Sequence, residues 1–324
     1  MIKYATIGTS FIAEQFVTGA NATGELELHA VYSRNYNTGI AFAKKFNCET
    51  VYTSLEDLAN DSSIDAVYVA SPNVFHSSQS ELLLNAGKHV ICEKPITTSA
   101  DEYKRLKALA DSKELVYIEA IIPIYNPSRI RIKNALGQIG NVCMAKIDYC
   151  QRSSRYDRFI NGEHVNIFDM SLHAGTLMDL GVYCVYAAVD LFGMPNSIKA
   201  SANFLKNGAD GSGVAIFEYD NFSASLTYSK TGQSIAPTEI VGDSGSVIME
   251  TAVYYQDAYL VKKGNKIKLY DDISKETLMG LEALAFCDFI KGERLDEYAQ
   301  NSQITTDVHT CMDTIKQIAN IKYK

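Results

Sequence analysis

The first 120 residues alternate between two hydrophobic periodicities. Short apolar runs typical of buried strands are centred near Ile2, Leu28, Ala66, His89 and Val116. Segments with the spacing of amphipathic helices lie between them, near Ala13, Ala41, Leu55, Glu81 and Tyr103. Because strands and helices alternate, this half is predicted to form a doubly wound parallel sheet, which binds ligands at the carboxyl ends of its strands.

From Asn141 onward the pattern changes to strand-like alternation. The predicted strands are Val142–Tyr149, Ser197–Phe204, Val214–Tyr219, Phe222–Tyr228, Glu239–Val241 and Val247–Met249. Turn sequences such as Asp220-Asn221 separate several of these runs, which predicts a large, mostly antiparallel open sheet in an α/β domain. We therefore expect a Rossmann domain at residues 1–120 and a substrate-binding and oligomerisation domain at residues 121–324. An open sheet face of this kind favours a homodimer or homotetramer.

Composition narrows the class of protein. A length of 324 residues fits two domains, and 47% hydrophobic with 21% charged residues is ordinary for a globular chain. The formal net charge of -8 argues against nucleic acid and anionic membrane surfaces as partners, which leaves small-molecule substrates. Seven cysteines without metal-ligand spacing predict reduced thiols. With no signal peptide or bilayer-length apolar run visible, we expect a cytoplasmic protein.

The first strand ends in a turn with a dinucleotide-binding pattern. That fingerprint needs glycine at the turn, a small residue where the backbone approaches the pyrophosphate, and a small residue where helix packs on strand. Gly8, Ser10 and Ala13 fill these three roles, although only the first is a glycine. The candidate cofactor-binding residues here are Gly8, Thr9, Ser10, Phe11 and Ile12.

The end of the second strand favours NADP over NAD. An NAD enzyme usually carries an acidic residue there for the ribose 2'-hydroxyl, whereas an arginine accommodates the 2'-phosphate of NADP. This chain has Ser33 and Arg34 at that place, and the Arg34 guanidinium is also suited to stack on adenine.

Two later strand ends supply further candidates. The loop after Ala66–Ala70 contributes Ser71, Pro72, Asn73 and His76 as cofactor-binding residues. The next strand ends in Ile91–Pro95, which places Glu93 and Lys94 at the same sheet edge. Since proline is the residue that commonly follows a cis peptide bond, we expect a cis bond between Lys94 and Pro95.

One apolar helix in the second half carries a carboxylate and a phenol. Asp179 and Tyr183 are four residues apart and are predicted to share a helix face, with Tyr186 three residues further along. A structural role, with the aspartate satisfied by the tyrosine hydroxyl, is the alternative to a functional one.

Taken together, the chain resembles the glucose-fructose oxidoreductase, inositol dehydrogenase and rhizopine-catabolism family, abbreviated Gfo/Idh/MocA. The resemblance covers nearly the whole length. The matching segments are Gly8–Ala13, Ser33-Arg34, Ser71–His76, Gly87–Pro95, Glu119-Ala120 and Leu177–Tyr183.

This resemblance implies a Rossmann domain followed by a mixed α/β domain whose open sheet mediates dimer contacts. It also implies that Lys94 is the catalytic lysine and that Asp179 is the family's helix aspartate. Tyr183 stands where inositol-type members have a catalytic histidine, as in the glucose-fructose oxidoreductase and dihydrodiol dehydrogenase branch, whose members generally use NADP. The chain departs from dihydrodiol-type relatives at Ile124, where they tend to have arginine, and at His173, where many members have a glycine cluster.

Hydride transfer to or from an alcohol carbon requires a group that exchanges the hydroxyl proton. A lysine cation lowers the pKa of a neighbouring phenol, so Tyr183 is a candidate acid/base with Lys94 as its tuning group. The reverse assignment, with Lys94 as proton donor, stays open. Asp179 is expected to orient the site and to stay charged near Lys94.

Other chemistries fit less well. The residues His164, Asp169 and His173 lack a recognisable metal-ligand pattern, and no GxSxG elbow follows a strand. We therefore predict no metal. The predicted function is an NADP-dependent oxidoreductase that acts on a sugar, polyol or related diol, and the alternative is a non-catalytic NADP-binding sensor on the same fold.

Overall fold

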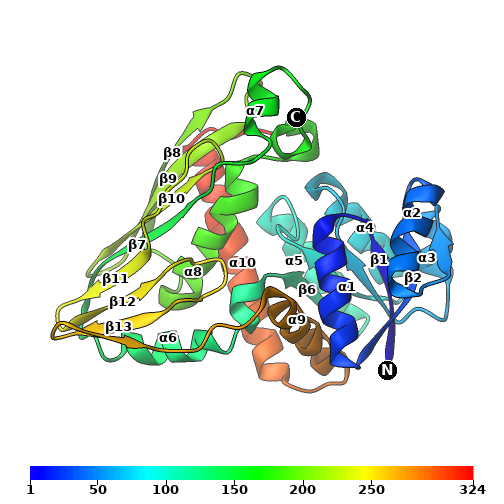
Figure 1. The fold of residues 1–324 in the computed structure, drawn as a ribbon, viewed down its shortest axis with the longest axis horizontal. Coiled ribbons are helices and arrows are strands. Elements are labelled where there is room, and N and C mark those ends of the chain that lie inside the picture. The colour runs from blue at the N-terminus through cyan, green and yellow to red at the C-terminus, as the bar shows by residue number, and fades with distance from the viewer. Residues whose placement is uncertain (324) are drawn as a thin grey trace. The chain divides into compact units, whose positions relative to one another are not determined.

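The computed structural model describes residues 1–323, which form two compact units (Figure 1). The first unit contains Met1–Tyr125 and, after a long excursion of the chain, Ile273–Ser302. The second unit contains Asn126–Asp272 and the chain from Gln303 onward. The sequence pattern placed a single boundary after residue 120, whereas the structure returns a later segment to the first unit.

The first unit is built on a six-stranded sheet in the order β3-β2-β1-β4-β5-β6. Its strands are β1 (Ile2–Ile7), β2 (Leu26–Tyr32), β3 (Thr50–Tyr52), β4 (Ala66–Val69), β5 (His89–Glu93) and β6 (Tyr117–Ala120). All neighbouring strands pair in parallel, and β4 is buried along its whole length. This order confirms the predicted doubly wound sheet. The direction in which successive strands are added reverses between β1 and β4, which is the topological switch point of the sheet.

Helices cover both faces of this sheet (Figure 1). They are α1 (Phe11–Thr23), α2 (Tyr36–Ala43), η1 (Lys44–Phe46), α3 (Leu55–Asn60), α4 (Asn73–Asn85), α5 (Ala100–Ser112), η2 (Ile122–Tyr125) and α9 (Lys275–Ile290). Helix α9 belongs here because it packs on α1 at two glycines. A Cβ on Gly19 would lie 2.8 Å from the backbone nitrogen of Gly280, so the two helices approach with almost no side chain between them.

The second unit is built on an eight-stranded sheet in the order β14-β13-β12-β11-β7-β10-β9-β8. Its strands are β7 (Val142–Cys150), β8 (Ser197–Phe204), β9 (Asp210–Glu218), β10 (Ser223–Ser229), β11 (Thr238–Gly242), β12 (Gly245–Met249), β13 (Tyr259–Lys262) and β14 (Asn265–Lys268). Every pair is antiparallel except β7 with β10, which confirms the mostly antiparallel sheet. Buried residues alternate with exposed ones, as Ala145 and Ile147 show in β7, so the sheet buries one face.

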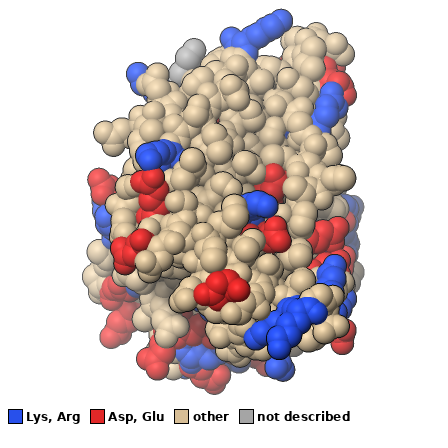
Figure 2. Space-filling view, turned by 90° about the vertical axis from the view of Figure 1, so that its left-hand side faces the viewer, with Lys and Arg blue, Asp and Glu red and all other residues tan. Residues whose placement is uncertain are grey.

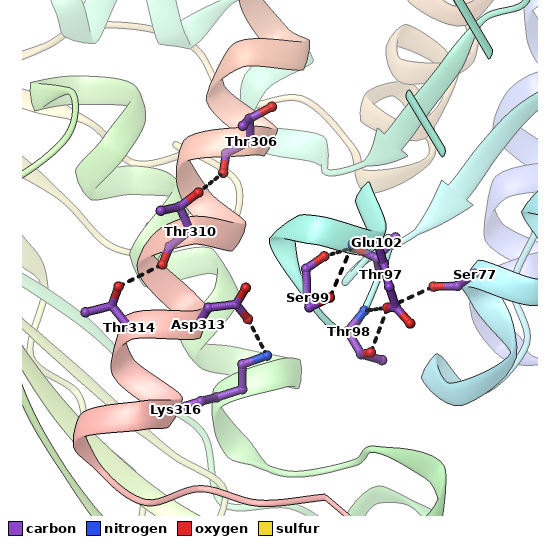
Figure 3. Close-up of polar contacts among 10 residues, drawn as sticks. All are labelled: Ser77, Thr97, Thr98, Ser99, Glu102, Thr306, Thr310, Asp313, Thr314 and Lys316. Carbon is purple, nitrogen blue, oxygen red and sulfur yellow. Dashed lines mark hydrogen bonds and ion pairs between the residues drawn. The ribbon is translucent and has the colours of Figure 1, made fainter. Parts of the chain in front are cut away.

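The helical elements of the second unit are mostly short. They are α6 (Ser128–Leu136), α7 (Tyr156–Ile160), η3 (Asn166–Phe168), η4 (Met170–Leu172), the π-helix η5 (Leu177–Gly181) and α8 (Val182–Phe192), and α10 (Leu295–Ile318) runs from the first unit into the second. Segment Met170–Phe192 is long and apolar enough to span a bilayer, but 78% of its most apolar window is buried inside the fold. On α10, the hydroxyls of Thr310 and Thr314 donate to carbonyls one turn earlier (Figure 3).

Candidate functional site

The turn after β1 has the geometry that a dinucleotide requires. Gly8 has φ +110°, and a Cβ there would lie 2.6 Å from the carbonyl oxygen of Ala70, so a larger residue would be both strained and obstructed. Ser10 is the exposed N-cap of α1 and makes no side-chain capping bond, which leaves the first backbone N–H groups of the helix available to a phosphate. Ala13 is fully buried where α1 packs on the sheet. These features fit the pyrophosphate of a dinucleotide.

The residues that follow β2 are divided between structure and surface. Ser33 is nearly buried, and its hydroxyl accepts a hydrogen bond from the backbone N–H of Asn35. Arg34 is exposed beside it. The loop therefore holds a fixed serine and presents one cation at the strand end where the adenosine ribose of a dinucleotide binds.

The loop after β4 is tied to the segment that follows β5 through one histidine. His76 is 1% exposed, and its Nδ1 and Nε2 lie 2.8 and 2.7 Å from the carbonyl oxygens of Pro95 and Ser71. Burial lowers the pKa of His76, while its contacts with the carbonyl oxygens of Pro95 and Ser71 oppose that shift. The Ser71 hydroxyl donates to the side chain of Gln79, which lies on α4 together with His76. His76 thus connects two of the predicted cofactor-binding loops.

Lys94 follows β5 directly, at the carboxyl edge of the sheet. The peptide bond between Lys94 and Pro95 is cis, as expected from the sequence. Its neighbour Glu93 is nearly buried, and the Glu93 carboxyl accepts from the Tyr68 hydroxyl at 2.6 Å and from the Lys94 backbone N–H at 3.2 Å. Burial raises the pKa of Glu93, while the Lys94 cation opposes that shift. Glu119 accepts from the backbone of Ile96 and fixes the other side of the segment.

The loop that continues from Lys94 is held by a single carboxylate on α5 (Figure 3). One oxygen of Glu102 accepts hydrogen bonds from the Thr98 backbone N–H at 3.0 Å, the Thr98 hydroxyl at 2.8 Å and the Ser77 hydroxyl at 3.0 Å. Ser99 caps the helix and accepts from the Glu102 N–H, which forms half of a capping box. Hydrogen bonds at the start of α5 therefore hold the loop that joins Lys94 to this helix.

Asp179 and Tyr183 belong to the second unit, on the π-helix and at the start of α8. Both side chains are partly exposed, and the Tyr183 ring meets the edge of Tyr149 at 5.7 Å between ring centroids, with an interplanar angle of 84°. Tyr186 points elsewhere, because it is fully buried and its hydroxyl bonds with Thr305. π-helical turns are often found at functional sites.

A lysine that the sequence analysis missed is paired with Asp179. Lys230, the residue after β10, has a side chain that is 4% exposed, and its Nζ lies 2.8 Å from Asp179 Oδ2. The same ammonium donates to the carbonyl of Ile167 at 3.0 Å and lies 5.5 Å from the centre of the Phe168 ring. Nothing in the local sequence marks this lysine, because its partner is 51 positions earlier in the chain.

A polar cavity of about 570 Å³ opens beside Tyr149 within the second unit. Its lining comes from the end of β7 and from the loops before β11 and after β12, and consists of Asp148, Tyr149, Cys150, Gln151, Gln233, Ser234, Ile235, Ala236, Glu250, Thr251, Val253, Tyr254 and Gln256. The described residues that line it include two carboxylates and three carboxamides but no Lys, Arg or His. Such a lining offers many partners for hydroxyl groups and no counter-ion for an anion.

The wall of this cavity is anchored from behind. Side chains of Asn126 and Ser128 donate to the backbone carbonyls of Tyr254 and Tyr255, and the Tyr255 hydroxyl donates to Asp190 at 3.2 Å. Asp190 in turn pairs with Arg129 on α6 at 2.6 Å. A charged network inside the unit therefore sets the position of the loop that lines the cavity.

The remaining sequence candidates lie apart from these groups. His164 bonds with Asp169 at 2.7 Å on an exposed loop, and His173 adopts a left-handed conformation and stacks on Tyr323. Ile124 is buried in η2. Across residues 1–323, no group of three or more His, Cys, Asp or Glu side chains is arranged to hold a metal ion.

Comparison with known families agrees with this anatomy. Residues 2–121 match the family described as "Oxidoreductase family, NAD-binding Rossmann fold", and residues 130–248 match "GFO/IDH/MocA C-terminal domain".

Individual relatives cover most of the chain. A Bacillus subtilis protein named scyllo-inositol 2-dehydrogenase (NADP(+)) IolU is 35% identical over 323 residues, covering 100% of this chain and 98% of its own. The Escherichia coli oxidoreductase YgjR is 37% identical over 296 residues, or 91% and 90% of the two chains. Among solved structures, KijD10, a 3-ketoreductase from Actinomadura kijaniata in complex with NADP and TDP-benzene, superposes with a TM-score of 0.84 at 20% identity, covering 98% and 97% of the chains.

Proposed function

Because the chain belongs to the Gfo/Idh/MocA family of NAD(P)-dependent oxidoreductases, we propose that it transfers hydride between NADP and a hydroxyl-bearing carbon of an uncharged sugar, polyol or diol. The proposal is supported by a dinucleotide turn at Gly8 in the first unit and by a cavity rich in hydroxyl-binding groups beside Tyr149 in the second. The nicotinamide ring supplies the hydride chemistry, so the chain must bind substrate and move one proton.

NADP is the proposed cofactor. An exposed arginine, Arg34, occupies the strand end where an NAD enzyme carries a carboxylate, and a guanidinium matches a phosphate with two parallel hydrogen bonds. Ser33 stands beside it and adds no negative charge. The name of the Bacillus subtilis relative, which specifies NADP(+), agrees with this preference. We expect NADPH to bind more tightly than NADH.

Tyr183 and Lys94 are proposed to handle the proton. A phenol is a poor base at neutral pH unless a cation stabilises its phenolate, and the Lys94 ammonium is the cation assigned to that task. In the oxidising direction Tyr183 takes the hydroxyl proton as hydride leaves the same carbon, and in reduction it returns that proton to the carbonyl oxygen. Asp179 is proposed to orient these groups.

The lining of the cavity supports an uncharged substrate. Asp148, Gln151 and Glu250 offer acceptors for hydroxyl hydrogens, and the described lining has no cation for a phosphate or a carboxylate. Transfer of an anionic ligand into such a site would leave its charge unpaired, which is costly. We therefore expect neutral polyols and aldoses to be used, and sugar phosphates and sugar acids to be rejected.

A non-catalytic NADP-binding sensor is the second candidate function. It requires the same cofactor turn but no proton-transfer groups, so the retention of Lys94, Asp179 and Tyr183 favours the enzyme.

The test is a fluorescence titration with NADPH and NADH, followed by a turnover screen of aldoses, ketoses, inositols and diols. We expect Lys94→Met and Tyr183→Phe to bind NADPH normally and to lose turnover by about 100-fold or more, the range typical of a lost acid/base group. Lys113→Met, at an exposed lysine of the same unit, is the matched control and should keep full activity. Tight NADPH binding without turnover on any compound would support the sensor instead, and undiminished turnover in Lys94→Met would refute the assigned proton chemistry.

A further inference from the structure

Lys230 is a buried cation with three well-defined contacts. Its Nζ has Asp179 Oδ2 at 2.8 Å, the Ile167 carbonyl oxygen at 3.0 Å and the face of Phe168 at 5.5 Å. The backbone of Lys230 is fixed as well, since its N–H donates to Gly211 and its carbonyl accepts from Ser153. A buried ammonium is costly unless it is paired and hydrogen-bonded, and these contacts meet that need.

The partner of this cation reaches solvent where the lysine does not. The Asp179 side chain is 37% exposed, against 4% for Lys230. The Asp179 carboxylate is therefore partly open to solvent, while the buried Lys230 ammonium pairs with it from the interior of the unit. A carboxylate held in this way has little rotational freedom.

Asp179 also acts on the neighbouring phenols. Burial is the main cause of the raised pKa of Tyr149, whose ring contacts Tyr183, and the charges of Tyr254 and Asp179 raise that pKa further. A lone carboxylate near Tyr183 would disfavour the phenolate and oppose the effect assigned to Lys94. The Lys230 ammonium, 2.8 Å from Asp179, offsets part of the negative electrostatic potential of the Asp179 carboxylate, because the potentials of opposite charges partly cancel.

We propose that Lys230 is a positioning residue of the oxidoreductase site, which pairs with Asp179, holds it in one orientation and offsets its charge, and thereby keeps Tyr183 able to form its phenolate. This inference rests on the proposed function, because it assigns Lys230 a role only through Asp179 and Tyr183. Asp210 on β9 also interacts electrostatically with Lys230; it is fully buried, and the same lysine favours its ionised form.

A purely structural role is the competing explanation, since Lys230 also fixes η3 through Ile167 and Phe168. The two roles differ in what they change. Loss of a structural contact lowers stability and activity at every pH, whereas loss of the charge compensation moves the pH at which turnover rises. The pH profile is therefore the decisive readout.

The experiment measures kcat and kcat/KM against pH, in the oxidising direction, for the wild type and for Lys230→Met. We expect the rising limb of the Lys230→Met profile to move upward by at least about half a pH unit, which lowers kcat on the acidic side of the midpoint by about threefold or more. Lys230→Arg keeps the charge and should retain the wild-type midpoint. Lys199→Met removes an exposed lysine on β8 that pairs with Glu218 on β9, and should leave the profile unchanged.

A double-mutant comparison ties the effect to Asp179. In an Asp179→Asn background there is no carboxylate for Lys230 to hold, so addition of Lys230→Met removes only the direct field of the ammonium and should shift the midpoint less than it does when Asp179 is present. If Lys230→Met alone fails to fold, Lys230→Gln takes its place in both backgrounds, because its amide loses the charge but can still donate a hydrogen bond to Asp179 or to the Ile167 carbonyl. An unshifted profile in Lys230→Met, or an equal shift with and without Asp179, overturns the proposal. A wild-type protein without turnover on any substrate refutes the proposed function instead.

Discussion

Asp210 is a buried carboxyl group with incomplete hydrogen bonding. Its Oδ2 accepts from the backbone N–H of Leu177 at 2.6 Å, whereas its buried Oδ1 has no hydrogen-bond partner. Burial raises the pKa of Asp210 to about 6, and the Lys230 cation partly opposes that shift. Asp210, at the start of β9, therefore contacts the first residue of the π-helix that carries Asp179. The negative charge of its ionised form is poorly compensated in the fold.

The pH dependence of stability should reveal this carboxyl group. Its pKa is higher in the folded chain than the ordinary value of 3.8, so the folded state binds the proton more tightly and stability falls as pH rises towards 6. Between pH 4.5 and 7.5 this residue should remove about 2 kcal/mol from the free energy of unfolding. Urea unfolding of Asp210→Asn should lack that part of the fall. Asp271→Asn, at an exposed position, is the control, and an identical slope in both variants would contradict the assignment.

At this scale the sequence identified the residues that carry a local signature. Gly8 could be found because its turn needs a conformation with positive φ, and Lys94 because it ends a strand in a recognisable run. Lys230 and Asp210 have no such signature. Lys230 contacts Asp179, which is 51 positions earlier in the chain, and Asp210 contacts Leu177, which is 33 positions earlier. A pattern along the chain does not encode contacts over such separations.

Among the elements, helix α5 has a role beyond packing. Its first turn uses Glu102 to bind two segments, the loop from Lys94 to Ser99 and the first turns of α4 at Ser77 (Figure 3). Capping interactions usually stabilise only their own helix. Here the same carboxylate holds the loop that starts at the proposed catalytic lysine, so helix formation and loop geometry are coupled.

Glu102→Ala should therefore affect both stability and catalysis. Three donors lose a charged acceptor in a half-buried place, and we expect a loss of about 2 kcal/mol in the free energy of unfolding, together with a lower kcat. Asp101→Ala changes the adjacent residue of the same turn, whose side chain is 99% exposed, and should have little effect. Chemical denaturation and steady-state kinetics on both variants provide the comparison. Equal behaviour of the two would show that the loop is held by other contacts.

Element types were more predictable than their neighbours. The run Ser197–Phe204 was predicted at its observed limits because alternation along a strand is a local property. The parallel pairing of β7 with β10 was not foreseen, because hairpin turns indicate only which consecutive strands meet and not where a long connection returns. The π-helical turn at Leu177–Gly181 was likewise expected as ordinary helix, since apolar spacing does not distinguish the two.

For the whole molecule, the outer face of the eight-stranded sheet is the feature that bears on assembly. Figure 2 shows the side of the molecule formed by this sheet, where charged side chains are sparse over the upper half. On the outer face of this sheet three apolar side chains are well exposed: Met144 (41%), Val214 (39%) and Ile216 (39%). These exposed apolar residues lie on β7 and β9, on either side of β10, and favour burial against a second copy, as predicted for the homo-oligomer.

Introduction of like charges should separate such an oligomer. In a two-fold interface each copy contributes the same patch, so Ile216→Asp places two carboxylates near one another and should shift a dimer towards monomer. Sedimentation velocity measures this directly. The control is Ile130→Asp, an exposed position on α6 rather than on the sheet. Assembly through this face is refuted if the wild type is monomeric or if Ile216→Asp leaves its mass unchanged.

The return of Ile273–Ser302 to the first unit has a consequence for synthesis of the chain. Helix α9 covers α1 at the Gly19–Gly280 contact, so the six-stranded sheet is complete at residue 120 while one of its covering helices is still missing. A ribosome must translate more than 150 further residues, from 120 to 275, before that helix exists. We infer that the nascent first unit exposes its α1 surface for most of translation, a period in which chaperone binding protects apolar surface. Its maturation is therefore a late event, although its sequence comes first.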